Sequence, residues 1–161
     1  MTEPRAPALR RAATVAFVLY LVVLAGAVFL PLPIGQVERG TGPSYDFVLR
    51  RPDLLGGWEV QRNVLMMVPF GVLLPLVVRW RYEVLVLACF VATLVIETVQ
   101  FLVSAAVGWA WRAFDVNDLL LNTIGGLLGL AITGVVLAVV RRPQVPPAHR
   151  LVPGVLAVAL V

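Results

Sequence analysis

The stretch that decides the fold runs from residue 112 to residue 129 and reads RAFDVNDLLLNTIGGLLG. It begins with charged residues and continues into uncharged, apolar sequence as far as residue 140. Because a helix has 3.6 residues per turn, spacings of three and four place residues on one face. The residues that share this face are Asp115, Asp118, Asn122, Gly125 and Gly129. Polar groups at the mouth of a membrane span are costly unless protein packs against them, so the rest of the chain must supply partners.

Composition indicates one small integral membrane domain. The 161 residues are 60% hydrophobic and have a mean hydropathy of +0.94, whereas soluble domains are roughly half apolar. All 13 basic residues are arginines, and the net charge is +4. Because these arginines are scattered between apolar runs, we read them as flanks of membrane spans and expect no nucleic-acid partner.

The single cysteine and the single histidine restrict the chemistry. Cys89 has no second cysteine for an intrachain disulfide or a cysteine-based metal site. His149 lies in a proline-rich tail without a second histidine or cysteine to share a metal. We therefore expect no cofactor and no metal centre.

Uncharged runs predict an all-α, polytopic transmembrane helix bundle. A span needs about 20 apolar residues, and shorter runs reach across when flanking residues help. The four predicted spans are residues 12–30, 63–78, 84–103 and 119–140. A cleaved signal peptide is the alternative for the first span, because Ala25-Gly-Ala27 resembles a cleavage site. Apolar sequence continues past it, which favours an uncleaved span.

The predicted domain organisation follows from these spans. Residues 1–11 form a cytoplasmic N-terminal segment, residues 12–140 the transmembrane domain, and residues 141–161 a proline-rich basic tail with an apolar end. The apolar end, residues 151–161, is too short to span alone. It is either an interfacial piece or part of a fifth span.

The polar segment between the first two spans predicts a short interfacial helix at residues 44–50. Ser44 would be its N-cap, and Tyr45 and Phe47 would lie at headgroup level. We read this segment as a membrane-surface anchor rather than a binding loop.

Glu97 is the one charged residue within the third span. A charge at the centre of a helix costs about 2.5–3.5 kcal/mol on insertion scales. Glu97, with Gln100 beside it on a polar stripe, should therefore face protein or water rather than lipid.

The arginines predict the orientation of this multi-pass protein in the cell membrane. A cytoplasmic N-terminus puts eight of the 13 arginines on the cytoplasmic side, in line with the positive-inside bias. Polar residues from four segments then fall at one depth, near the extracytoplasmic surface. They are Asn63, Glu97, Gln100, Arg112, Asp115, Asp118 and Asn122.

Purely structural roles are open for several of these residues. Asp115 can cap the fourth span with Asp118 at position N3. Asn122 can bond a neighbouring helix. Arg112 can pair with Asp115 or Glu97. The glycines that suit helix packing are Gly125, Gly126 and Gly129.

Functional roles are also open. Glu97, Asp115 and Asp118 are candidates for general acid and base catalysis on a lipid headgroup. Their oxygens also suit a divalent cation, a polar pocket for a sugar or peptide headgroup, or a proton path. Neither a nucleophile motif nor a phosphate loop accompanies them, so whether the protein is an enzyme is left open. A transporter is disfavoured, because the inner half of the fourth span offers only Thr133 as a polar side chain.

As an ordered set, three motifs resemble the VanZ-like family. They are NVLMMVPFG at residues 63–71, ETVQ at 97–100 and RAFDVNDLLLNTIGG at 112–126. The resemblance implies a small multi-pass bacterial membrane protein. The namesake of the family is associated with resistance to the glycopeptide antibiotic teicoplanin.

We therefore expect a VanZ-like protein of the bacterial cell envelope. Its seven polar residues would bind a cell-surface or lipid-linked ligand in an outward-facing pocket and contribute to glycopeptide tolerance. The alternative is an intramembrane enzyme that acts on lipid-linked headgroups through Glu97, Asp115 and Asp118. Expected partners are membrane lipid, a lipid-linked cell-wall precursor or glycopeptide, and a second copy of the chain.

Overall fold

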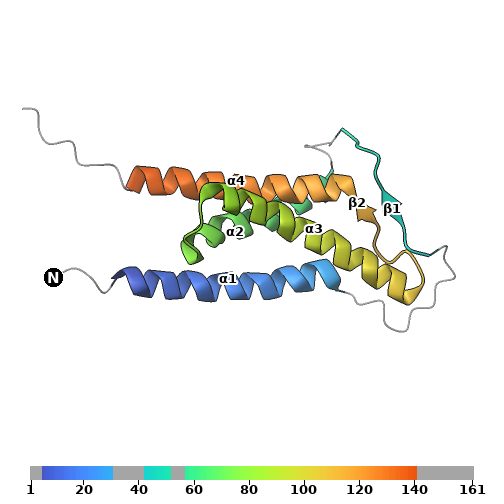
Figure 1. Cartoon of the computed structure of the whole chain (residues 1–161), viewed down its shortest axis with the longest axis horizontal. Helices are drawn as coiled ribbons and strands as arrows, with labels where there is room; N and C mark the ends of the chain where they lie inside the picture. Colours follow the sequence, from blue (N-terminus) through green and yellow to red (C-terminus); the bar gives the residue numbers. More distant parts are fainter. Residues whose placement is uncertain (1–4, 31–41, 52–56, 141–161) are drawn as a thin grey trace, which may run out of the picture.

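The computed structural model describes residues 5–30, 42–51 and 57–140 (Figure 1). Its elements are α1 (Arg5–Phe29), β1 (Tyr45–Asp46), α2 (Trp58–Val77), α3 (Tyr82–Val107), β2 (Phe114–Asp115) and α4 (Val116–Val140). Each of these four helices is long and apolar enough to cross a membrane. The predicted all-α, four-span fold class is confirmed, whereas the predicted tail at 141–161 lies outside the described residues.

The helices extend beyond the uncharged runs that predicted them. α2 begins at Trp58 rather than at residue 63, so Glu59 and Arg62 are helical. An acid in the first turn of a helix is favoured by the positive end of the helix dipole. The charge of Glu59 therefore does not prevent α2 from beginning before the uncharged run. α3 ends at Val107, and the next residue, Gly108, has a φ of 81°, the left-handed conformation common directly after a helix.

The predicted interfacial helix at residues 44–50 is wrong. β1 instead pairs in parallel with β2, with Tyr45 opposite Phe114 and Asp46 opposite Asp115. Asn117 holds the chain after β1: its Oδ1 accepts from the N–H of Arg50 at 2.8 Å, and its Nδ2 donates to the Val48 carbonyl at 2.9 Å. These bonds satisfy the backbone groups that a helix would have paired internally.

The glycines of the deciding stretch lie where α4 meets α2. A Cβ on Gly125 would overlap the carbonyl of Val64, and a Cβ on Gly129 would overlap that of Val68. Further along the same face, Thr133 Oγ1 donates to the Val72 carbonyl at 3.0 Å. The α2 and α4 backbones therefore approach as closely as small residues allow.

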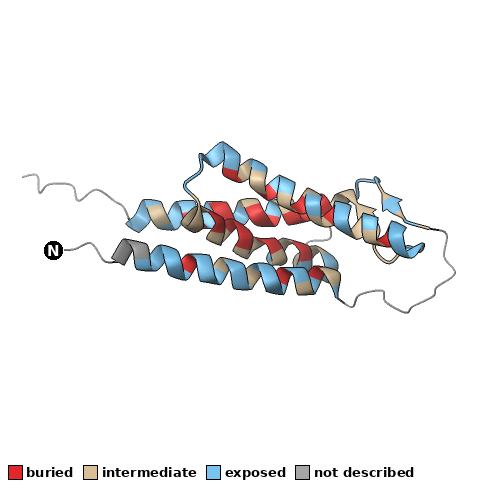
Figure 2. Ribbon diagram, turned by 60° about the horizontal axis from the view of Figure 1, so that its bottom comes forward, coloured by how far each residue is buried: buried red, intermediate tan, exposed pale blue. Residues whose placement is uncertain are grey.

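The other two helices complete the bundle around this pair. On α3, Cys89 lies against Gly126, where an added Cβ would come within 3.0 Å of its Sγ. α1 is mostly exposed (Figure 2). It buries Leu24 and Val28 in the common core, and Tyr20 donates its hydroxyl to the Met66 carbonyl at 2.8 Å. The bundle is thus tightly packed where the glycines of α4 meet α2. The start of α4 lies at the other end of this helix, beside the two strands.

Candidate functional site

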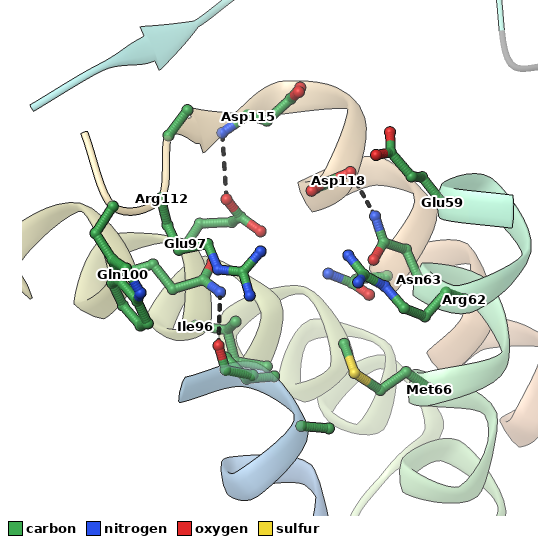
Figure 3. Close-up of a pocket in the computed structure, with 15 residues that line it drawn as sticks. Glu59, Arg62, Asn63, Met66, Ile96, Glu97, Gln100, Arg112, Asp115 and Asp118 are labelled. Atoms are coloured by element: carbon green, nitrogen blue, oxygen red, sulfur yellow. Dashed lines mark hydrogen bonds between the residues drawn. The ribbon is translucent and has the colours of Figure 1, made fainter. Parts of the chain in front are cut away.

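A polar cavity of about 290 Å³ lies at the end of the bundle where α4 begins (Figure 3). It is lined by residues of α2, α3, α4 and the loop between α3 and β2, with the end of α1 as an apolar border. The seven polar residues that the sequence placed at one depth all line it: Asn63, Glu97, Gln100, Arg112, Asp115, Asp118 and Asn122. The structure therefore brings this set together, while its role as a ligand site stays a prediction.

Asn63 and Asp118 join α2 to α4 across the cavity. Asn63 is 3% exposed and donates from Nδ2 to Asp118 Oδ1. A hydrogen bond to a charged carboxylate is stronger than one between neutral groups. This contact fixes the position of Asp118, and among the described residues no hydrogen bond to its second oxygen is seen.

Glu97 is a buried carboxylate on α3, with an exposure of 2%. Its Oε2 accepts from the backbone N–H of Asp115 at 3.2 Å, which ties α3 to β2 (Figure 3). Among the described residues, neither Glu97 nor Asp115 forms an ion pair with Arg112, so the pairing that the sequence left open is not formed. The Arg112 guanidinium lies over the ring of Trp111 instead, 5.6 Å from its centroid.

Asp115 caps α4. Its Oδ1 accepts from the backbone N–H of Asn117 at 2.7 Å and from Asn117 Nδ2 at 2.9 Å. This satisfies one of the unpaired donors at the helix start. The capping interpretation of Asp115 therefore has direct geometric support, and Asp118 follows at N3.

Ser104 positions the loop that carries Arg112. Its Oγ donates to the Arg112 carbonyl at 2.7 Å and accepts from the Arg112 N–H at 2.9 Å. One turn earlier on α3, Gln100 donates from Nε2 to the Val28 carbonyl at 3.3 Å. α3 thus holds the loop with one side chain and the end of α1 with another.

Two buried polar atoms of the cavity residues are left without a partner in the described part of the chain. They are Asn122 Oδ1 and Arg112 Nε. Asn122 is only 2% exposed, and its Oδ1 forms none of the interhelical bonds that the sequence left open for this residue, within the described part of the chain. An unsatisfied buried group costs about 1–3 kcal/mol, so one acceptor and one donor of this site lack the pairing that buried polar atoms normally have.

Residues 17–137 match the protein family described as VanZ/LLP1. The chain belongs to this family. The match confirms the resemblance drawn from the three motifs, and it covers every residue that lines the polar cavity. Neither a curated protein nor a solved structure matches the chain.

Sequence reasoning missed two charged residues of this VanZ/LLP1 domain. Glu59 and Arg62 also line the polar cavity (Figure 3). Both residues precede the uncharged run that marks the second span, so the sequence assigns them to the polar segment before it. Glu59 lies one helical turn before Asn63 on the same face, so extending the helix backwards by one turn would have found it.

A divalent cation has little support in this VanZ/LLP1 domain. In the described ranges, the His, Cys, Asp and Glu side chains form no group of three that could hold a metal ion. Glu97, Asp115 and Asp118 line one cavity without converging on one point.

Proposed function

We propose that this membrane protein of the VanZ/LLP1 family binds the polar headgroup of a cell-surface or lipid-linked ligand in the polar cavity. The observation that carries the proposal is the convergence of seven polar residues on one cavity where a buried acceptor and a buried donor have no partner among the described residues. Buried polar atoms are normally hydrogen-bonded, and a bound ligand is one way to satisfy them.

The charges of the cavity favour a ligand that both donates and accepts hydrogen bonds. Arg62 and Arg112 offer donors only, whereas the carboxylates of Glu97 and Asp118 accept. A headgroup rich in hydroxyls satisfies both kinds of group. A purely anionic or purely cationic ligand would leave one kind unpaired.

The volume favours a headgroup over a whole glycopeptide. Pockets for drug-sized ligands measure about 300–1,000 Å³, and this cavity of about 290 Å³ is at the lower end. We therefore infer that glycopeptide tolerance would arise because the protein engages a lipid-linked cell-wall precursor, not because it encloses the antibiotic.

We infer from the arginine distribution that this cavity lies on the extracytoplasmic side. Arg79 and Arg81 flank the opposite ends of α2 and α3, on the side that the positive-inside bias assigns to the cytoplasm. Cell-wall precursors and glycopeptides meet on the extracytoplasmic face. This orientation is part of the proposal.

The test is teicoplanin tolerance of a glycopeptide-sensitive bacterial host that produces the protein. We expect Glu97→Gln and Asp118→Asn to abolish the tolerance that the unchanged protein confers, at equal amounts of protein in the membrane. Glu83→Gln is the matched control, because Glu83 is an exposed glutamate at the other end of the same helix. Full tolerance with both cavity variants would refute the proposal.

A second candidate function is an intramembrane enzyme acting on lipid-linked headgroups. Glu97 is buried and has one described hydrogen bond, to Oε2, which leaves Oε1 for a reacting proton. Asp115 and Asp118 would orient the headgroup. Purified protein should then convert a lipid-linked substrate, and Glu97→Gln should abolish turnover; lack of turnover with and without Mg²⁺ would leave the binding function alone.

A further inference from the structure

A second cavity of about 350 Å³ borders the polar cavity and shares three acidic residues with it. It is formed by the segment after β1, the first turn of α2 and the first turns of α4. Glu59, Asp115 and Asp118 line both this cavity and the polar cavity, so we call these three residues the acidic wall. The second cavity plays no part in the function proposed above.

The second cavity has an apolar part that faces outward from the bundle. Leu120 and Ile124 on α4 are 40% and 46% exposed, and Leu49 beside them is 68% exposed. In a chain that spans the membrane, these side chains lie within the first turns of a span. The hydrocarbon of a lipid is the natural neighbour for this surface.

The second cavity also has a cationic part at the start of the helices. Arg50 and Arg51 line it just outside α4. Arg50 is also paired with Asp46, whose carboxylate accepts from the Val48 N–H at 2.9 Å. Arginines at the boundary between polar and apolar regions suit a lipid phosphate.

The loop that carries these arginines is held against α4 before any ligand arrives. Asn117, in the first turn of α4, accepts from the Arg50 N–H and donates to the Val48 carbonyl. A preformed site loses less conformational entropy when it binds. The cationic part and the apolar part are therefore fixed relative to each other.

The acidic wall determines the kind of headgroup. Three carboxylates face two arginines in this cavity, so a phosphate without hydrogen-bond donors would meet unfavourable charge. Asp115 Oδ1 and Asp118 Oδ1 already accept from Asn117 and Asn63, which leaves their second oxygens for other donors. Hydroxyl groups on the headgroup would supply those donors.

We propose that the second cavity binds a glycerophospholipid whose headgroup carries hydroxyl groups as well as the phosphate. The phosphate contacts Arg50 and Arg51, the hydroxyls contact the acidic wall, and an acyl chain lies along Leu120 and Ile124. This site shares the acidic wall with the polar cavity, but Arg50, Arg51, Leu120 and Ile124 line only the second cavity, and it does not require a ligand in the polar cavity.

The test measures binding of short-chain lipids to the purified full-length protein in detergent by native mass spectrometry. The probes are dihexanoyl phosphatidylglycerol, dihexanoyl phosphatidylcholine, which lacks headgroup hydroxyls, and glycerol phosphate, which lacks acyl chains. We expect saturable binding of phosphatidylglycerol, roughly tenfold weaker binding of phosphatidylcholine and no saturable binding of glycerol phosphate.

Two matched pairs of variants locate the site. Arg51→Gln should weaken phosphatidylglycerol binding roughly threefold to tenfold. The control is Arg79→Gln, which should leave this binding unchanged because Arg79 is an exposed residue at the opposite end of the bundle. Ile124→Ser should weaken it roughly threefold, whereas Ile132→Ser should not. Ile132 is on the same helix, is 49% exposed and lies outside the cavity.

Several results would overturn the proposal. Equal binding of the two lipids would show no headgroup selection, and equal effects of Ile124→Ser and Ile132→Ser would show an ordinary lipid-facing surface. Glycerol phosphate binding as tightly as the lipid would show a phosphate site instead. Because Glu97 lines only the polar cavity, loss of lipid binding in Glu97→Gln would place the lipid there and not in the second cavity.

Discussion

The face of α4 that follows the capping residue Asp115 lines the polar cavity in its first half and packs against α2 in its second half. In the first half, Asp118 and Asn122 present side chains to a cavity, and Asn122 Oδ1 is unpaired among the described residues. In the second half, Gly125 and Gly129 present no side chain, and the backbone of α2 occupies the space. The comparison suggests that close packing of the glycine half stabilises the bundle sufficiently to tolerate unsatisfied groups in the polar half.

The largest expected effect is in the glycine half. Gly125→Ala places a Cβ on the backbone carbonyl of Val64, and a backbone cannot move aside as a side chain can. We expect a loss of about 3 kcal/mol or more in the free energy of unfolding, at or above the upper end of overpacking costs. Thermal unfolding in detergent, followed by size-exclusion chromatography, measures it.

The same helix offers a control for this variant. Within the described structure, no heavy atom lies within 4 Å of a Cβ added at Gly134. Gly134→Ala should leave the stability unchanged or slightly raised, because alanine is the better helix former. If the two variants unfold at the same temperature, close packing of α4 on α2 is not what holds the bundle.

Substitutions of two buried asparagines distinguish polar groups that stabilise the fold from polar groups that bind a ligand. Asn63→Leu removes the donor to Asp118, and we expect a loss of about 1.5–3 kcal/mol in the free energy of unfolding. Asn122→Leu removes an unpaired acceptor, so it should leave stability unchanged or raised while abolishing tolerance. A large destabilisation by Asn122→Leu would mean that Asn122 is structural and that the polar half is not specialised for binding.

A smaller effect is expected at Ser104, which connects the packed core to the cavity. Ser104→Ala leaves the buried N–H and carbonyl of Arg112 without their partner, at a cost of about 1–2 kcal/mol. We expect faster proteolysis of the loop at residues 108–115. Thr98→Ala, an exposed hydroxyl earlier on the same helix, is the control; equal proteolysis of both variants would contradict the assignment.

The smallest expected effect is the loss of charge on Asp46, which lies outside the membrane spans, as the pH falls. The Val48 N–H, followed by the Arg50 guanidinium, holds the pKa of Asp46 below its ordinary value of 3.8. The ionised carboxylate therefore stabilises the strand pair above pH 3.8, and this contribution is lost as the pH falls through the lower folded pKa. NMR titration of the Asp46 carboxyl measures the midpoint.

Arg50→Gln tests the order of these causes. Because the Val48 N–H is the larger cause, the pKa of Asp46 in this variant should rise only part of the way towards 3.8. A complete return to 3.8 would assign the whole effect to the arginine.

The four helices and the shared depth of the cavity residues could be predicted because both follow from hydropathy and helical periodicity. Asn63 and Asp118 stand at the starts of two apolar runs, and Glu97 lies in the corresponding half of the third run, so a bundle of antiparallel spans brings them to a similar level. The strand pair could not be predicted, because two-residue strands have too little sequence to show a pattern and depend on Asn117, a side chain far along the chain. Glu59 could not be predicted as a cavity residue from hydropathy, because it precedes the uncharged run that marks the second span.

The central claim is that the polar cavity opens to the outside of the cell, and cysteine labelling tests it most directly. In a Cys89→Ala background, Ala110→Cys places a single thiol on the exposed loop beside the cavity, and Arg79→Cys places one at the opposite end. With an impermeant maleimide on intact cells, we predict labelling at position 110 and labelling at position 79 only after lysis. The reverse pattern would place the cavity in the cytoplasm and contradict the proposed function.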